Sequence, residues 1–156
     1  MSHLDFLLKH HLQNRKLLKK LLLSVDESQA NEIPPFFNNN IIWNCAHVIA
    51  VQQSLIYQLC CKTPRADKSI IRQFTIGTKP TEYFETGFIE NIGELLLSTS
   101  VQMAEDLNNE EFIVGQPFMT AIKVELTQVE EALAFTNYHE GLHLGVITSL
   151  LKCIQK

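Results

Sequence analysis

One segment of the sequence is apolar on almost every side. Residues 41–59 read IIWNCAHVIAVQQSLIYQL and contain no Lys, Arg, Asp or Glu. We expect a helix that begins near Asn39 or Asn40, because asparagine is a favourable N-cap residue, and that runs to about Cys61. A helix that is apolar around most of its circumference is usually buried against several neighbours. The rest of the chain must therefore supply helices that cover it.

Three further segments have the periodicity of long helices. Apolar residues recur at helical spacing in residues 2–24, in residues 82–107 and in residues 127–154. Thr127 and Glu130 have the spacing of a capping box, in which each side chain satisfies a backbone donor at the other's position. This pair is expected to mark the beginning of the last helix.

Two long connections separate these helical segments. Residues 26–38 contain a Pro-Pro pair, which a helix interior does not tolerate. Residues 62–81 are long enough to cross a bundle, so the second and third helices can run parallel. Residues 70–76 and 112–123 are expected to be loops or short helical turns rather than strands. The sequence thus predicts an all-α protein, a single four-helix bundle over residues 1–156 with a long crossover connection between helices 2 and 3.

The composition argues against several classes of partner. Hydrophobic residues make up 46% of the chain and charged residues 19%, so the protein can form a core and does not resemble a disordered chain. The net charge of −4 favours neither nucleic acid nor an anionic membrane surface as a partner. The one basic cluster is expected to be a solvated face of the first helix. It consists of Arg15, Lys16, Lys19 and Lys20.

The sequence also indicates where the protein is found. No stretch approaches the roughly 20 apolar residues that a membrane span needs. Asp5 and Lys9 stand where a secretory signal would be apolar. The four cysteines include no C-x-x-C pair, and the neighbouring Cys60 and Cys61 do not suggest a disulfide framework. We therefore expect a cytoplasmic protein with reduced thiols and no membrane association.

His139 and His143 are four residues apart in the last predicted helix. That spacing places them about 40° apart around the helix and roughly 6 Å apart along it, so both rings can reach one ion. They interrupt the apolar face, and burying two imidazoles without partners is costly. A shared metal ion removes that cost. The alternative is a pair of core histidines that are hydrogen-bonded to their neighbours.

His47 strengthens the metal interpretation because it lies in the middle of the apolar segment. Three inward-facing histidines on two helices are enough to hold an ion and to leave a position for water or substrate. Neutral imidazoles suit Zn, Ni, Fe or Co, so the ligands do not select the metal. Of the other histidines, His3 and His10 are expected to be exposed. His11 faces the core and could line a pocket or provide a fourth ligand.

The string from His139 to His143 also matches two other motifs. As H-E-x-x-H it is the zinc-protease signature, but residues 144–156 contain no Asp or Glu to serve as the downstream ligand. As E-x-x-H it is half of a di-iron site, but Asn44 stands at the matching position before His47. We reject both interpretations. Two alternative interpretations of Glu140 follow: it is a general base at the metal, or it is a surface glutamate beside the site.

These motifs together resemble those of the DinB-like superfamily. Trp43 stands four residues before His47, and residues 127–147 read TQVEEALAFTNYHEGLHLGVI. The resemblance implies two antiparallel helix pairs joined by a crossover. It also implies a mononuclear metal site of His47, His139 and His143. Relatives catalyse thiol S-transfer with bacillithiol or mycothiol, mycothiol-dependent isomerisation or metal-dependent hydrolysis, and they often form homodimers.

The resemblance favours an enzyme that acts on a small-molecule electrophile. An open metal position would bind a low-molecular-weight thiol and deprotonate it, or it would activate water for hydrolysis. The connections 62–81 and 108–126 are expected to flank the site mouth. The alternative is a non-catalytic metal- or ligand-binding bundle with a structural metal, whose fourth position a protein ligand would close. A third possibility is a bundle that keeps the histidines and binds nothing.

Overall fold

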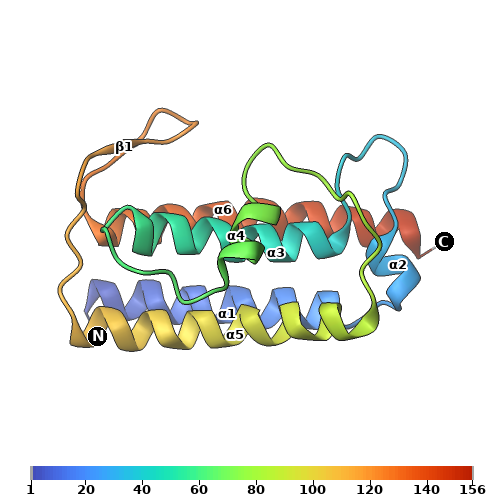
Figure 1. Ribbon diagram of the computed structural model, residues 1–156, viewed down its shortest axis with the longest axis horizontal. Helices are drawn as coiled ribbons and strands as arrows, with labels where there is room; N and C mark the ends of the chain where they lie inside the picture. The colour runs from blue at the N-terminus through green and yellow to red at the C-terminus, as the bar shows by residue number, and fades with distance from the viewer. Residues whose placement is uncertain (1, 156) are drawn as a thin grey trace.

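Four long helices make up most of the computed structural model, which describes residues 2–155. They are listed here with their bounds: α1 (His3–Leu22), α3 (Ile41–Gln52), α5 (Thr86–Asn109) and α6 (Val129–Ile154). Figure 1 shows them side by side along the long axis of the molecule, with α3 and α5 running in the direction opposite to α1 and α6. The all-α class predicted from the sequence is confirmed. No helix within residues 2–155 is long and apolar enough to cross a membrane.

Shorter elements occupy the connections. The helix α2 (Glu27–Asn31) follows α1, and α4 (Lys68–Gln73) lies within the crossover between α3 and α5. The crossover runs along the length of the molecule in Figure 1. The strands β1 (Phe118–Met119) and β2 (Glu125–Leu126) form a small antiparallel hairpin before α6. The expectation that residues 70–76 form loops or short helical turns is confirmed, whereas the expectation that residues 112–123 contain no strand is wrong.

The second predicted helix does not keep α-helical winding to its end. The α-helix α3 ends at Gln52, and the chain continues as a π-helix, η1 (Gln53–Gln58). The buried side chain of Gln53 accepts hydrogen bonds from the backbone N–H groups of Arg65 at 2.6 Å and Ala66 at 3.0 Å. Because these donors belong to the crossover, Gln53 attaches that connection to the helix.

The last helix begins one residue later than the sequence predicted. The carboxylate of Glu131 accepts hydrogen bonds from the backbone N–H groups of Thr127 at 2.7 Å and Gln128 at 3.2 Å. The hydroxyl of Thr127 donates to the same oxygen. Glu131 therefore satisfies the first backbone donors, and the assignment of that role to Glu130 is wrong.

The α3 helix lies at the centre of the core, as its composition predicted. From Ile41 to Ala50 every residue is buried. Two apolar residues of α6 lie on the surface, because Leu142 is 50% exposed and Val146 is 37% exposed. Two expectations for α1 hold, since His3 and His10 are exposed. All four cysteines are free thiols.

Candidate metal centre

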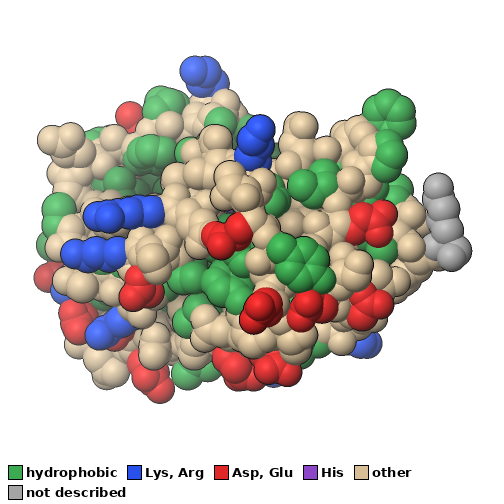
Figure 2. Space-filling view, turned by 45° about the vertical axis from the view of Figure 1, so that its right-hand side comes forward, with side chains coloured by type: hydrophobic (Ala, Val, Ile, Leu, Met, Phe, Trp, Pro, Cys, Tyr) green, Lys and Arg blue, Asp and Glu red, His purple; other side chains and the backbone are tan. Residues whose placement is uncertain are grey.

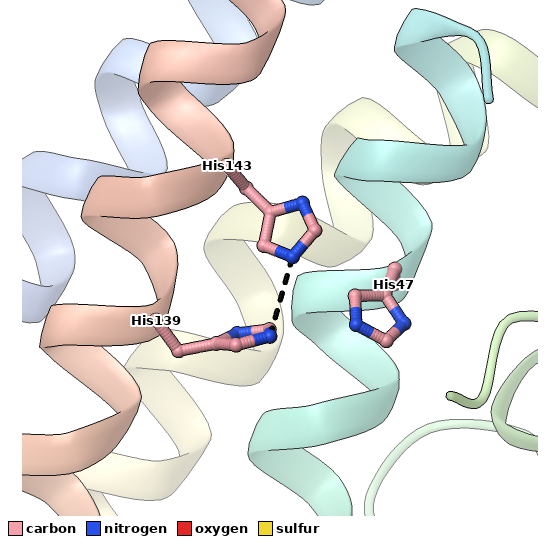
Figure 3. A group of neighbouring side chains, drawn as sticks. All are labelled: His47, His139 and His143. Atoms are coloured by element: carbon pink, nitrogen blue, oxygen red, sulfur yellow. Dashed lines mark hydrogen bonds between the residues drawn. The ribbon is translucent and has the colours of Figure 1, made fainter. Parts of the chain in front are cut away.

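Three histidines converge between the antiparallel neighbours α3 and α6. His139 and His143 extend from successive turns of α6, and His47 faces them from α3 (Figure 3). One donor atom from each ring can be chosen so that all three lie within 4.8 Å of one another. The Nε2 atoms of His139 and His143 are 3.2 Å apart. The structure thus brings together the three residues that the sequence singled out.

Hydrogen bonds fix the tautomers of two of these rings. The Nδ1 atom of His47 lies 2.6 Å from the carbonyl oxygen of Phe74, which can only accept, so Nδ1 carries the hydrogen. His143 Nδ1 lies 2.7 Å from Asn44 Oδ1. The amide of Asn44 is oriented because its Nδ2 donates to the carbonyl of Asn40 at 2.7 Å. In both neutral rings, Nε2 is left with a free lone pair, as a metal ligand requires.

The spacing of two of the three donor atoms fits a single ion. Two imidazole nitrogens at about 2.05 Å from one tetrahedral zinc ion are about 3.3 Å apart. The observed separation between His139 Nε2 and His143 Nε2 is 3.2 Å. His139 Nδ1 is buried and has no hydrogen-bond partner among the described residues. The donor set therefore suits a divalent ion of the zinc, nickel or iron type.

Burial keeps the three rings neutral. Burial lowers the pKa of His47, and it lowers the pKa of His139 to about 4, with repulsion from His47 as the next cause. Burial also lowers the pKa of His143 to about 3, with further contributions from His139 and His47. A histidine must be deprotonated to bind a metal. Near neutral pH the triad is therefore in the protonation state that metal binding needs.

Trp43 forms one wall of the site. Its ring stacks on His47 with centroids 4.5 Å apart and an angle of 12° between the planes. Its indole Nε1–H donates to the hydroxyl of Thr78 at 3.1 Å, so the crossover holds the tryptophan in place. No histidine side chain is visible on the face of the molecule that Figure 2 shows.

Glu140 is buried, so the expectation that it is a surface glutamate is wrong. Its side chain is fully buried, and Oε1 accepts a hydrogen bond from Arg15 Nε at 2.7 Å. Burial opposes ionisation of Glu140, but Arg15 and His11 outweigh it and hold the pKa below its usual value. Arg15 itself is fully buried, so the expectation that it lies on a solvated face of the first helix is also wrong. Glu140, the residue after His139, lies about 100° further around the helix. It therefore contacts α1 instead of α3.

His11 belongs to the same buried cluster and not to the triad. Its Nδ1 lies 2.8 Å from Ser100 Oγ, and its Nε2 lies 3.0 Å from Glu140 Oε1. Both ring nitrogens are thus engaged, and the expectation of a fourth metal ligand at this position is wrong. The ion pair of Arg15 and Glu140 was missed. The available signal was that Arg15 lies four residues after His11 and three before Leu18, on the buried face of α1.

The group of described residues with metal-ligand geometry consists of the three histidines alone. Cys45 is near in sequence, but it is buried, and burial raises the pKa of its thiol to about 12. Three protein ligands are the pattern of a catalytic zinc site, whereas structural sites normally have four. The arrangement can therefore hold an ion and present one or more positions to a second molecule.

Comparison with known proteins identifies the family of the chain. A search of curated proteins found no match. The sequence model of the DinB superfamily matches residues 10–147, a span that contains Trp43 and all three histidines of the triad. On the strength of this match, the chain belongs to the DinB superfamily.

Proposed function

We propose that this protein is a DinB-type four-helix bundle that acts as a metal-dependent thiol S-transferase on a small electrophile. The observation that carries the proposal is a triad of neutral histidines with convergent Nε2 atoms and no fourth protein ligand among the described residues. An ion bound there would lower the pKa of a coordinated thiol until it is a thiolate. The sulfur would then form a bond to carbon as the leaving group departs, and the thiol proton would pass to solvent.

The residues of the chain would orient the site and shield it in part from water. Asn44 and the carbonyl of Phe74 hold two rings by their Nδ1–H groups, and the stacked Trp43 restricts His47. Partners of this kind orient metal ligands and raise their basicity. His47 is buried and His139 and His143 are half-buried, so the surroundings would shield the site in part from bulk water.

A thiol is favoured over water because the site lacks a general base. Among residues 2–155 no carboxylate joins the histidine group, and Glu140 Oε1 is occupied by Arg15 and His11. A positioned general base accelerates hydrolysis. A thiol bound to the ion is deprotonated without such a base, because the charge of the ion lowers the pKa of the thiol. A purely structural ion is disfavoured because such sites normally have a fourth protein ligand.

The test is an assay of thiol conjugation. Protein loaded with zinc, nickel or iron(II) is mixed with a panel of low-molecular-weight thiols and monochlorobimane, and the thioether is identified by mass spectrometry. We expect product with at least one thiol and a large loss of rate in His143→Ala. The variant His10→Ala is the matched control, because it removes an exposed histidine. Hydrolysis of an ester substrate without thiol dependence would contradict the proposal in favour of a hydrolase.

A further inference from the structure

A cavity of about 210 Å³ lies against the metal triad. His47 and His139 form one side of it, whereas His143 does not line it. The cavity is lined by parts of the chain that are far apart in sequence: α3 with η1, the crossover, the hairpin and α6. Its apolar wall consists of Ala50, Val51, Leu55, Ile76, Phe118 and Phe135. A molecule bound to an ion at the triad would extend into this space.

The cavity is uncharged apart from the two histidines. The rest of its lining consists of Ser54, Thr75, Thr120 and Ala121, so no Lys, Arg, Asp or Glu contributes. The hydroxyl oxygen of Thr120 accepts a hydrogen bond from the backbone N–H of Val124 at 3.0 Å. A charged group placed here would lose its hydration without gaining an ionic partner. The lining thus selects against the charged parts of a ligand.

A different hollow of the molecule is charged, but its charges are already paired. It is lined by Lys62, Arg65, Asp106 and Glu110 among others. Lys62 lies 2.8 Å from Glu110, and Arg65 lies 2.6 Å from Asp106. That hollow does not include a triad histidine. The apolar cavity, by contrast, is lined by His47 and His139 and so joins the metal centre to a space for a ligand.

The volume limits what the cavity can hold. An apolar cavity of about 150 Å³ is large enough to bind benzene, so 210 Å³ accommodates one ring with a short substituent. We propose that this cavity binds the uncharged apolar body of the electrophile, a single aromatic ring or a branched alkyl group of similar size, with the reacting carbon toward His47 and His139. This inference rests on the proposed function, because it assigns the substrate class of the same site.

The test uses hydroxamic acids, which share one metal-binding group and differ in their tails. Affinities of acetohydroxamate, benzohydroxamate and 4-carboxybenzohydroxamate for zinc-loaded protein are measured by calorimetry. Burial of a phenyl ring should make benzohydroxamate bind at least about tenfold tighter than acetohydroxamate. The added carboxylate should remove most of that gain. Equal affinities for all three would overturn the inference.

Adjacent residues of β1 provide a matched pair of variants. Phe118 lines the cavity and is 43% exposed, whereas Met119 is 51% exposed and is not part of the lining. We expect Phe118→Asp to abolish the preference for the phenyl tail and Met119→Asp to preserve it. Since both side chains are substantially exposed, neither change should unfold the protein. Equal behaviour of the two variants would place the phenyl ring elsewhere.

A metal-free arm separates this inference from the proposed function. Toluene is titrated into metal-free protein, and the methyl resonances of Ala50 and Val51 are followed by NMR in wild type and in Phe118→Asp. Saturable shifts in the wild type that weaken in the variant support the cavity even if no metal binds. The cavity would be excluded as the binding place of the apolar group if the tail did not change the affinity of the hydroxamates and toluene caused no shifts. Binding of the hydroxamates through the metal would in that case still support the metal site.

Discussion

Asn44 and the backbone of Phe74 determine which nitrogens of the triad are available. Each accepts the Nδ1–H of one histidine, Asn44 from His143 and Phe74 from His47. The histidines themselves could be predicted, because the i, i+4 spacing and a third histidine in an apolar helix are visible in the sequence. Their hydrogen-bond partners could not, because Phe74 reaches His47 only through the path of the crossover.

Replacement of Asn44 should weaken metal binding without removing the ligands. We expect Asn44→Ala to lower zinc affinity about 10- to 100-fold, because His143 loses the acceptor that fixes its tautomer and orientation. Competition with a chromophoric chelator measures the affinity, and thermal unfolding of the metal-free protein shows whether the fold is intact. Unchanged affinity would show that Asn44 does not orient His143.

The pair of Arg15 and Glu140 should matter for stability more than for the metal. Glu140→Ala leaves the buried guanidinium without its carboxylate, and such a change costs about 3–5 kcal/mol. We expect this loss in urea unfolding, with the metal content per folded chain unchanged. The double variant Arg15→Met with Glu140→Leu should recover much of the loss, because it removes both charges. A stable Glu140→Ala protein with strongly reduced activity would instead restore the general-base interpretation.

At the scale of elements, the long helices were predictable, whereas α4 was expected only as a loop or a short helical turn and α2 was not expected at all. α1, α3, α5 and α6 have enough residues for an apolar period to be recognised. α2, with its 5 residues, and α4, with 6, are too short for that signal. Glu27 of α2 accepts from the backbone N–H of Thr86 at 2.6 Å, a contact that needs the tertiary fold. The π-helical winding of η1 was also missed, because its apolar pattern resembles that of an α-helix.

The crossover should loosen when its attachment to η1 is removed. Gln53→Ala deprives the N–H groups of Arg65 and Ala66 of their acceptor, at a cost of about 1–3 kcal/mol for a buried group. Hydrogen exchange of these amides should become faster, while exchange in α6 should change little. Gln13→Ala, at an exposed position of α1, is the control. Unaltered exchange at residues 65 and 66 would contradict the proposed attachment.

The whole molecule combines a candidate metal site and a buried ionic cluster on two different faces of α6. His139 and His143 face α3, whereas Glu140 faces Arg15 and His11 of α1. The sequence could predict the first because it lies within known motif spacing. It could not predict the second, because the rotation of α1 relative to α6 is set by packing.

Acid should destabilise the metal-free protein. The pKa values of His139 and His143, lowered by burial to about 4 and about 3, lie below the ordinary value of 6.5. Below pH 6.5 the two histidines therefore bind protons in the unfolded chain that they do not bind in the folded chain. The stability is full above that pH and falls as the pH approaches 4. Urea unfolding at pH 7.5 and pH 5 should show this loss, and His139→Gln with His143→Gln should reduce it. Equal loss in that variant would assign the effect to other groups.

The metal content of the untagged protein tests the central claim most directly. Mass spectrometry of the protein, with the double variant His139→Ala/His143→Ala and the control His3→Ala/His10→Ala, gives the ions bound per chain. The three-histidine site predicts about one divalent ion in the wild type and the control, and none in the double variant. A wild-type protein that is empty and does not take up added zinc, nickel or iron would contradict the metal site. A double variant that keeps its full complement of metal would contradict it equally.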